Sequence, residues 1–357
     1  MHILTFQLHN FRNLARAEIS PCAGVNVVYG ENGHGKTSLL EAIWLFTGCR
    51  SFRSADAADL VMENQVQSNL QTGFISNERE QHASLEIVKR RTLNLNGFPQ
   101  ETPRRMLGVF PAVAFTPDTL SLVKGGPGER RRFLDVALSM LTPAYAVRLS
   151  KYLKALAQRN ALLRQNDPSV ELLDTWDASL ANQASGLLAA RLRYLEELIP
   201  RARDFYAGIS GARENLEVVP HITGVEGPSE DAYLAAFART RQNDLRRQMT
   251  TVGPHRDDLT LTLDGRPLRD FGSQGQQRSA ALALKLAEAA ALGDIAREAP
   301  AALLDDVLSE LDARRQADLL KYLEGWQVFL TCCEPSHALH GRAGKVFHVT
   351  NGEVSEG

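Results

Sequence analysis

The sequence predicts an α/β fold in which a mixed sheet with helices is interrupted by an inserted lobe that is mainly α-helical. The β-rich run Val25–Tyr29 leads into a glycine-rich loop and then into apolar residues at helical spacing over 37–46. From about residue 128 to about residue 208, the chain shows little strand signal and much helical periodicity. The apolar runs 301–305 and 328–332 have the composition of strands buried in a parallel sheet.

Length and composition exclude several classes of protein. The 357 residues are enough for two lobes, and a hydrophobic content of 44% is ordinary for a globular chain. The apolar runs are too short for a membrane span and no secretory signal opens the chain, which predicts a cytoplasmic protein that does not engage a membrane. The cysteines lack metal-binding spacing, so free thiols are expected at Cys22, Cys49, Cys332 and Cys333.

The net charge of −2 argues against binding nucleic acid by bulk charge, but it allows a local basic face. The polar loop after the first predicted helix carries Arg50 and Arg53, and it is a candidate for sensing nucleotide or DNA. Charge runs are usually solvated surface, so each basic run by itself is weak support for a DNA contact. These runs lie at 89–91, 130–132 and 246–247.

The first third of the chain is predicted to be rich in strands. Alternating segments at 70–74, 83–88 and 92–97 follow a first strand at 3–8. Asn96-Gly97 is a strong signal for a hairpin turn, because both residues tolerate positive φ. A further short strand at 113–115 ends before Pro117.

The middle of the chain predicts a helical hairpin. Apolar residues recur at helical spacing over 144–165 and 172–206, and Asn166-Asp167-Pro168 separates the two helices. The helices are too short for a long coiled-coil arm, and no heptad register is sustained. The remaining predicted elements are strands at 216–222 and 258–263, helices at 230–249 and 275–297, and turns at Asp264-Gly265 and Asn351-Gly352, the second inside a hairpin at 346–354.

These elements predict three segments. Residues 1–127 would form the first half of an α/β lobe, and residues 251–357 its second half. Residues 128–250 would form the mainly helical lobe that is inserted between them.

The loop that follows the strand Val25–Tyr29 matches the phosphate-binding pattern G-x-x-x-x-G-K-[ST] at every fixed position. Its glycines let the backbone curl around phosphate oxygens at the start of a helix, whose dipole favours an anion. Lys36 would bring its charge to the β- and γ-phosphates, and the Thr37 hydroxyl would ligate Mg²⁺. The residues predicted to bind ATP here are Gly30, Glu31, Asn32, Gly33, His34, Gly35, Lys36 and Thr37.

Two acids close the apolar run that begins at residue 301. A carboxylate that holds Mg²⁺ belongs at the carboxyl end of a strand near the phosphate loop, and Asp305 fits that role. Asp306 is then placed to orient or deprotonate the attacking water. Glutamate is commoner at this position in related ATPases, and the shorter Asp306 would suit slow turnover. With Lys36, these acids make up the predicted catalytic set.

The segment Ser273-Gln274-Gly275-Gln276-Gln277 resembles the S-G-G-Q signature of ABC-type ATPases. Ser273 offers a hydroxyl, Gly275 permits close backbone approach, and a helix begins here with its positive end. In that architecture the signature faces nucleotide held by another subunit, so the resemblance implies an ATP-dependent homodimer in which Ser273, Gly275 and Gln276 complete the partner's site. The segment 309–312 resembles a D-loop, whereas the position of the switch histidine holds Thr331-Cys332-Cys333.

Several segments together resemble the RecF family of bacterial recombination mediators. They are Arg12-Asn13-Leu14, Pro117-Asp118, and the segments 122–127, 130–135, 253–258 and 303–312. The resemblance runs from the first strand nearly to the last. It implies an ATPase head of the SMC and ABC type, with a helical second lobe.

RecF resemblance also implies a function. Such proteins dimerise on ATP, bind DNA, and hydrolyse ATP slowly and faster with DNA. They act at stalled forks and single-strand gaps, helping RecA to load with RecO and RecR, and they support the SOS response. A nucleoid-associated cytoplasmic protein without nuclease activity is therefore expected, since the acidic pair at 305–306 is already assigned to ATP.

Two other functions are compatible with the motifs. One is an ABC-type ATPase coupled to a membrane partner, which the segment 130–135 and the missing switch histidine disfavour. The other is an ATP-binding scaffold without significant hydrolysis, which Asp306 in place of glutamate makes harder to dismiss.

Overall fold

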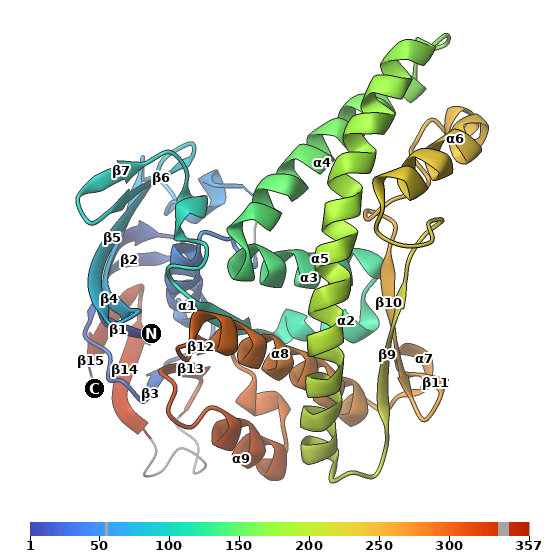
Figure 1. Ribbon diagram of the computed structural model, residues 1–357. Helices are drawn as coiled ribbons and strands as arrows, with labels where there is room; N and C mark the ends of the chain where they lie inside the picture. Colours follow the sequence, from blue (N-terminus) through green and yellow to red (C-terminus); the bar gives the residue numbers. More distant parts are fainter. Residues whose placement is uncertain (54–55, 335–342, 357) are drawn as a thin grey trace. The chain divides into compact units, whose positions relative to one another are not determined.

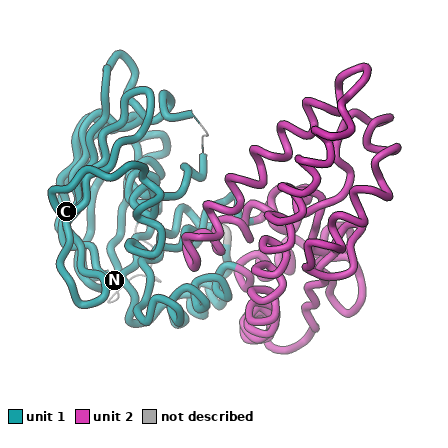
Figure 2. The backbone as a smooth tube through the Cα atoms, turned by 45° about the horizontal axis from the view of Figure 1, so that its top comes forward, with its two compact units in different colours: residues 1–119, 285–357 teal, residues 120–284 magenta. Residues whose placement is uncertain are grey.

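The computed structural model describes residues 1–53, 56–334 and 343–356. The chain divides into two compact units, which Figure 2 colours separately. Unit 1 comprises residues 1–119 and 285–357, and unit 2 comprises residues 120–284. Unit 1 is therefore built from both ends of the chain, while unit 2 is continuous. The segment boundaries expected from the sequence, at 127/128 and 250/251, stay a prediction.

Unit 1 is organised by a twelve-stranded mixed sheet (Figure 1). Its strands follow the order β7-β6-β5-β4-β1-β2-β15-β14-β3-β13-β12-β8. From β14 to β8 neighbouring strands are parallel, and from β7 to β2 they are antiparallel. The bounds are β1 His2–Phe11, β2 Leu14–Ile19, β3 Val25–Tyr29, β4 Ser68–Ser76, β5 Arg79–Ile87, β6 Arg91–Leu95, β7 Phe98–Gln100, β8 Ala112–Phe115, β12 Ala301–Leu304, β13 Val328–Cys332, β14 Ala343–Thr350 and β15 Glu353–Glu356.

The parallel part of this sheet explains the apolar runs of the sequence. Val28 of β3, Leu303 of β12 and Phe329 of β13 are fully buried, as expected for strands covered on both faces. Helix α1 is also almost entirely buried. The helical elements of unit 1 are α1 Lys36–Trp44, η1 Leu45–Thr47, η2 Ala58–Leu60, η3 Pro103–Met106, η5 Leu308–Glu310 and α9 Ala313–Tyr322. Two elements cross the boundary between the units. Helix α8 Gln274–Ala296 begins in unit 2 and ends in unit 1, and η4 Pro117–Leu120 begins in unit 1 and ends at the first residue of unit 2.

Unit 2 is mainly helical and contains a three-stranded antiparallel sheet of order β11-β10-β9. The predicted helical hairpin is confirmed as α4 and α5, which pack together. The side chain of Ser169 caps α5 by accepting from the N–H of Leu172. The bounds are α2 Ser121–Lys124, α3 Pro127–Leu141, α4 Pro143–Leu163, α5 Val170–Ser210, α6 Glu230–Arg247, α7 Leu268–Phe271, β9 Leu216–His221, β10 Asp258–Leu263 and β11 Arg266–Pro267.

Buried ion pairs connect helices α4, α5 and α6 of unit 2. Arg159 of α4 is fully buried, and its guanidinium donates to Asp177 of α5 at 2.5 Å and to Asp244 of α6 at 2.7 Å. Arg241 of α6 also donates to Asp177, at 2.6 Å. Removing one member of such a network leaves a buried charge uncompensated, which is strongly destabilising.

Four hairpins in the described parts of the two units turn on two residues that both have positive φ, as type I′ turns require. The turn Asn77-Glu78 between β4 and β5 has no Asn-Gly or Asp-Gly pair. Such a pair predicts the other three turns, and each prediction is confirmed. They are Asn96-Gly97 between β6 and β7, Asp264-Gly265 between β10 and β11, and Asn351-Gly352 between β14 and β15.

Candidate nucleotide-binding site

The loop between β3 and α1 has the shape of a phosphate cradle. Gly30 has φ of 151°, and a Cβ there would lie 2.3 Å from the carbonyl oxygen of Val349. Gly35 has φ of 119°, and a Cβ there would lie 2.5 Å from a methyl carbon of Leu14. The start of α1 has neither a side-chain cap nor an acidic residue in its first turn. Its first N–H groups are therefore available to an anion.

The ammonium group of Lys36 is hydrogen-bonded to this loop. Its side chain is 4% exposed, and Nζ donates to the carbonyl oxygens of Gly30 at 2.7 Å and Glu31 at 3.1 Å. Asn32 Oδ1 lies 3.3 Å from the same nitrogen. His34 is turned to Glu31, with 3.6 Å between Nε2 and Oε2. The ammonium therefore sits inside the cradle, where a phosphate oxygen can exchange for the loop carbonyls.

Asn13, in the turn between β1 and β2, fastens the loop from outside. Its Nδ2 donates to the carbonyl oxygen of Gly33 at 2.6 Å, and its Oδ1 accepts from the Ser38 hydroxyl at 2.8 Å. In the sequence, Asn13 belongs to the RecF-like triplet Arg12-Asn13-Leu14, but the sequence predicts no role for it at the nucleotide. Asn13 therefore bridges the loop and α1.

Asp305 and Thr37 are brought together across the sheet. Asp305 directly follows β12, and Thr37 is the second residue of α1. The Thr37 hydroxyl donates to Asp305 Oδ1 at 2.9 Å, and the Thr331 hydroxyl donates to the same oxygen at 3.0 Å. Because β13 lies between β3 and β12, Thr331 fills the gap between the two strands that carry the site. The two residues that the sequence assigns to Mg²⁺ are thus in contact.

Asp306 adjoins this pair in a left-handed backbone conformation, with φ of 51°. Its N–H donates to the Thr331 hydroxyl oxygen at 2.8 Å, which fixes the chain at that point. Burial raises the pKa of Asp305, hydrogen bonds from Thr37 and Thr331 act against this, and the charge of Asp306 raises it further. A cation beside a buried carboxylate with a raised pKa stabilises its charged form. A carboxylate together with a hydroxyl also provides the oxygen ligands that Mg²⁺ prefers.

A buried carboxylate on α1 organises the loop that carries Arg50 and Arg53. Glu41 is fully buried and accepts from Arg12 at 2.7 and 3.1 Å and from the Ser51 hydroxyl at 2.5 Å. Arg53 lies 3.5 Å from Glu41 and 3.4 Å from the Ser38 hydroxyl. Arg53 therefore points towards Ser38 and Glu41 of α1, next to the phosphate loop. Arg50 forms no ion pair within the described part of the chain.

The switch position is occupied by polar groups other than histidine. Thr331 contacts both acids, as described, and Cys333 lies next to the phosphate loop. The Cys333 thiol is 3.2 Å from Asn32 Oδ1 and 4.0 Å from Lys36 Nζ. Thr331 and Cys333 therefore occupy the position at which the switch histidine is missing from the sequence.

The predicted signature residues belong to unit 2, where they form a capping box. The Ser273 hydroxyl accepts from the N–H of Gln276 at 3.3 Å, and Gln276 Oε1 accepts from the N–H of Ser273 at 2.6 Å. Gly275 lies between them in the first turn of α8. Gln276 Nε2 donates to Glu214 Oε1 at 2.6 Å, and the buried Tyr206 hydroxyl donates to Glu214 Oε2 at 2.6 Å. Glu214 therefore fixes which way the Gln276 amide faces.

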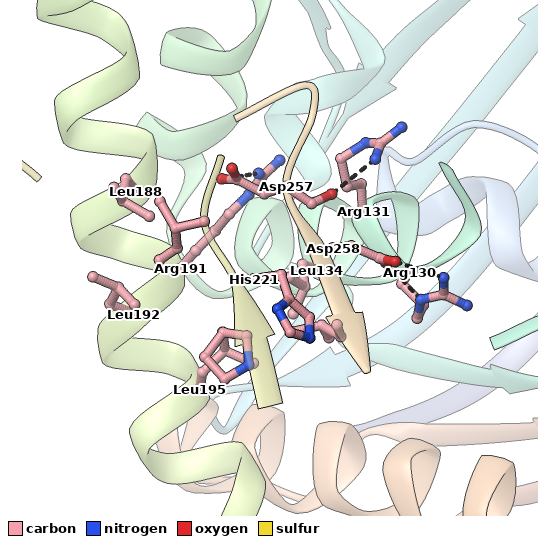
Figure 3. A pocket seen from close by; sticks show the side chains of 13 residues that line it. Arg130, Arg131, Leu134, Leu188, Arg191, Leu192, Leu195, His221, Asp257 and Asp258 are labelled. Carbon is pink, nitrogen blue, oxygen red and sulfur yellow. Dashed lines mark hydrogen bonds and ion pairs between the residues drawn. The ribbon is translucent and has the colours of Figure 1, made fainter. Parts of the chain in front are cut away.

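Two segments singled out in the sequence, 130–135 and 253–258, meet in a buried network of unit 2 (Figure 3). Arg130 makes two hydrogen bonds to Asp258, at 2.7 and 2.9 Å, and Arg131 donates to the carbonyl oxygen of Asp257 at 2.8 Å. Arg191 of α5 binds Asp135 at 2.8 Å. The cavity beside them measures about 20 Å³, which is room for one water. These segments hold unit 2 together, and Arg130 is buried rather than part of a solvated face.

The comparisons with known proteins agree with this geometry. The family model of the RecF/RecN/SMC N-terminal domain matches residues 2–103. The DNA replication and repair protein RecF of Agathobacter rectalis is 36% identical over 362 residues, which cover 99% of both chains. The chain belongs to the RecF family. The RecF-type fold expected from the sequence is therefore confirmed.

Solved structures extend the RecF relationship to three dimensions. A structure of the recombination mediator protein RecF-ATP in the RecFOR pathway superposes with a TM-score of 0.91 at 32% identity, over 99% of this chain and 97% of that one. An Smc head domain from Pyrococcus furiosus, bound to the C-terminal domain of ScpA, gives a TM-score of 0.58 at 16% identity, over 100% and 96% of the chains. This second likeness concerns the fold alone, which is that of an Smc head domain.

Within the residues that the structure describes, no helix combines the length and the apolar character needed to cross a bilayer.

Proposed function

We propose that this RecF-family chain is an ATP-dependent, DNA-binding mediator of recombination and repair that dimerises on ATP and hydrolyses it slowly. The single observation that carries the proposal is the contact of Thr37 with Asp305 at 2.9 Å beside the Lys36 cradle. Four separate parts of the chain, β3, α1, β12 and β13, converge there. Such convergence of a phosphate loop and a strand-end carboxylate is the core of a P-loop ATPase.

Residues 30–37 would bind the phosphates of ATP. Lys36 would exchange its loop carbonyls for β- and γ-phosphate oxygens, and the free N–H groups at the start of α1 would add backbone donors. Thr37 and Asp305 would hold Mg²⁺, which neutralises charge developing on the phosphates. The raised pKa of Asp305 supports this role, because burial without a cation disfavours its charged form.

Asp306 would orient the attacking water or accept its proton. Its backbone is fixed by Thr331, so its position depends on β13 rather than on a flexible loop. Aspartate is one methylene shorter than the glutamate common in related ATPases, which supports slow turnover. Replacing Asp306 with Asn would test this step by ATP turnover. Equal rates near zero for both proteins would favour an ATP-binding scaffold instead.

Ser273, Gly275 and Gln276 would complete the nucleotide site of a second copy. Their capping box presents the start of α8, with a hydroxyl and a glycine, as a unit suited to a γ-phosphate. ATP would then join two copies, with one phosphate loop and one signature at each nucleotide. The similar RecF-ATP structure supports the choice of ligand.

DNA is the proposed polymer partner, and RecO- and RecR-type mediators and RecA are the proposed protein partners. Support comes from the relatives, which are a DNA replication and repair protein and a recombination mediator of the RecFOR pathway. Through them the chain would assist RecA loading and SOS induction.

The proposal is tested by titrating a fluorescent gapped DNA with the protein, with and without ATP, and following anisotropy. We expect ATP to tighten binding in the wild type and to have no effect in Ser273→Arg, although that variant still binds nucleotide at its own phosphate loop. Lys36→Met should lose both ATP binding and dimerisation. A Lys36→Met protein that binds ATP and dimerises normally, or wild-type DNA binding that ignores ATP, would overturn the proposal.

A further inference from the structure

Three arginines from separate segments of unit 1 meet at the end of the P-loop helix. Arg91, at the start of β6, donates from Nη1 to the carbonyl oxygen of Cys49 at 2.7 Å, next to Arg50. The backbone at Gly48 approaches η3 so closely that a Cβ there would lie 3.3 Å from Arg104 Cα. With their chain neighbours they make up the cationic cluster: Arg50, Lys89, Arg90, Arg91, Arg104 and Arg105.

The cationic cluster lacks ion-pair partners in the described part of unit 1. Within the described ranges, no Asp or Glu forms an ion pair with any of its six members. By contrast, Arg130, Arg159 and Arg191 in unit 2 are each paired with carboxylates. Burial lowers the pKa of Arg91, and the charges of Arg50 and Arg104 lower it further. Like charges held together at a surface are unfavourable, and an anion placed against them relieves that cost.

We propose that the cationic cluster binds the phosphate backbone of DNA. This inference rests on the proposed function and adds the surface to it. Arg50, Arg90 and Arg104 are exposed, so their charged ends are accessible to a polymer. Because the net charge of the whole chain is only −2, bulk charge gives little attraction for DNA, and phosphates would instead be attracted by a local group of cations such as this cluster.

The cluster is also tied to the nucleotide helix. The indole N–H of Trp44 donates to the carbonyl oxygen of Arg50 at 2.9 Å. Trp44 is the last residue of α1, and Lys36 is the first. DNA held at Arg50 would thus contact the far end of the helix that starts at the phosphates.

Charge reversal tests the proposal without touching the nucleotide site. Arg104→Glu and the double variant Lys89→Glu, Arg90→Glu alter exposed side chains, so the fold should survive. Arg79→Glu is the matched control, because Arg79 is exposed and lies at the opposite end of β5 from the turn 88–90. Each protein is titrated with fluorescent gapped DNA in ATP at several salt concentrations, and ATP binding is measured in parallel.

We expect the cluster variants to bind DNA at least fivefold more weakly than Arg79→Glu, with unchanged ATP affinity. The slope of log K against log salt should fall by about 1 for each phosphate that the variant no longer neutralises. If all variants bind DNA as tightly as the wild type, the cluster is not the DNA contact, and the proposed function still stands. Absence of DNA binding by the wild type would overturn both. Variants that keep DNA binding but lose binding to phosphatidylglycerol vesicles would show the cluster to be a lipid contact instead.

Discussion

Thr331 and Asp305 are joined by a hydrogen bond of 3.0 Å, from the threonine hydroxyl to Asp305 Oδ1. The same hydroxyl oxygen accepts from the N–H of Asp306 at 2.8 Å. One buried side chain of β13 therefore positions both acids of the predicted catalytic set.

We predict that Thr331→Val lowers ATP turnover and stability together. Valine keeps the shape of threonine but leaves the Asp306 N–H without its acceptor and Asp305 without one donor. A buried polar group without a partner costs about 1–3 kcal/mol. Urea unfolding and ATP turnover measure the two effects. Thr331→Ser, which retains the hydroxyl, should restore most of both, and a Ser variant as damaged as Val would contradict this role.

We predict that Asp305→Asn stabilises the protein without nucleotide and abolishes hydrolysis. The raised pKa of Asp305 means that the fold disfavours the charged carboxylate. The cost is present at neutral pH, where the group is charged in both states, and it fades as the pH falls through the raised pKa. Asparagine removes the charge and can still accept from Thr37 and Thr331.

The measurement is thermal unfolding of both proteins in the absence of ATP and Mg²⁺. We expect a higher Tm for Asp305→Asn at pH 8, on the order of 2 °C, and a smaller difference in acid. A variant less stable than the wild type at pH 8 would show that the carboxylate stabilises the fold even without a cation.

We predict that Glu214→Ala impairs the signature without affecting the phosphate loop. The Gln276 amide would lose the carboxylate that orients it, and with it the fixed hydrogen bond to Ser273. Hydrogen bonds to charged groups contribute about 1.5–3 kcal/mol, so ATP-dependent dimerisation should weaken by about tenfold or more. Sedimentation with ATP measures this, alongside nucleotide affinity.

Glu226→Ala is a suitable comparison, because Glu226 is an exposed glutamate of unit 2 with no ion pair among the described residues. Equal dimerisation by the two alanine variants would exclude a positioning role for Glu214.

We predict that unit 2 loses stability as the pH falls from about 6.5 towards 4. Burial lowers the pKa of His255 to about 4, so the unfolded chain takes up a proton in this range and the folded chain does not. The ring is held by the Tyr152 hydroxyl at 2.5 Å and the Thr250 carbonyl oxygen at 3.1 Å. Urea unfolding of the wild type and His255→Asn across this range isolates the effect. Parallel pH profiles for the two proteins would argue against it.

The sequence predicts the main elements of both units and the strands that carry the phosphate loop and the acidic pair. It does not predict β2, because the buried residues Leu14, Ala17 and Ile19 do not alternate strictly. It also assigns no role to Asn13 or Glu214. Both act on residues that are near in space and distant in sequence, and periodicity carries no information about such contacts. Thr331 stands out in the sequence only as a missing histidine, since its effect depends on β13 lying between β3 and β12.

The order of strands in unit 1 has a consequence for the growing chain. The two sheet neighbours of β3 are β13 and β14, which begin at Val328 and Ala343. During synthesis on the ribosome, β3, which leads into the phosphate loop, therefore has no hydrogen-bonded neighbour on either edge until almost the whole protein has been made. The continuous unit 2 is synthesised before these neighbours. A message cut short before the codon for Val328 yields a chain whose nucleotide strand has no neighbour on either side.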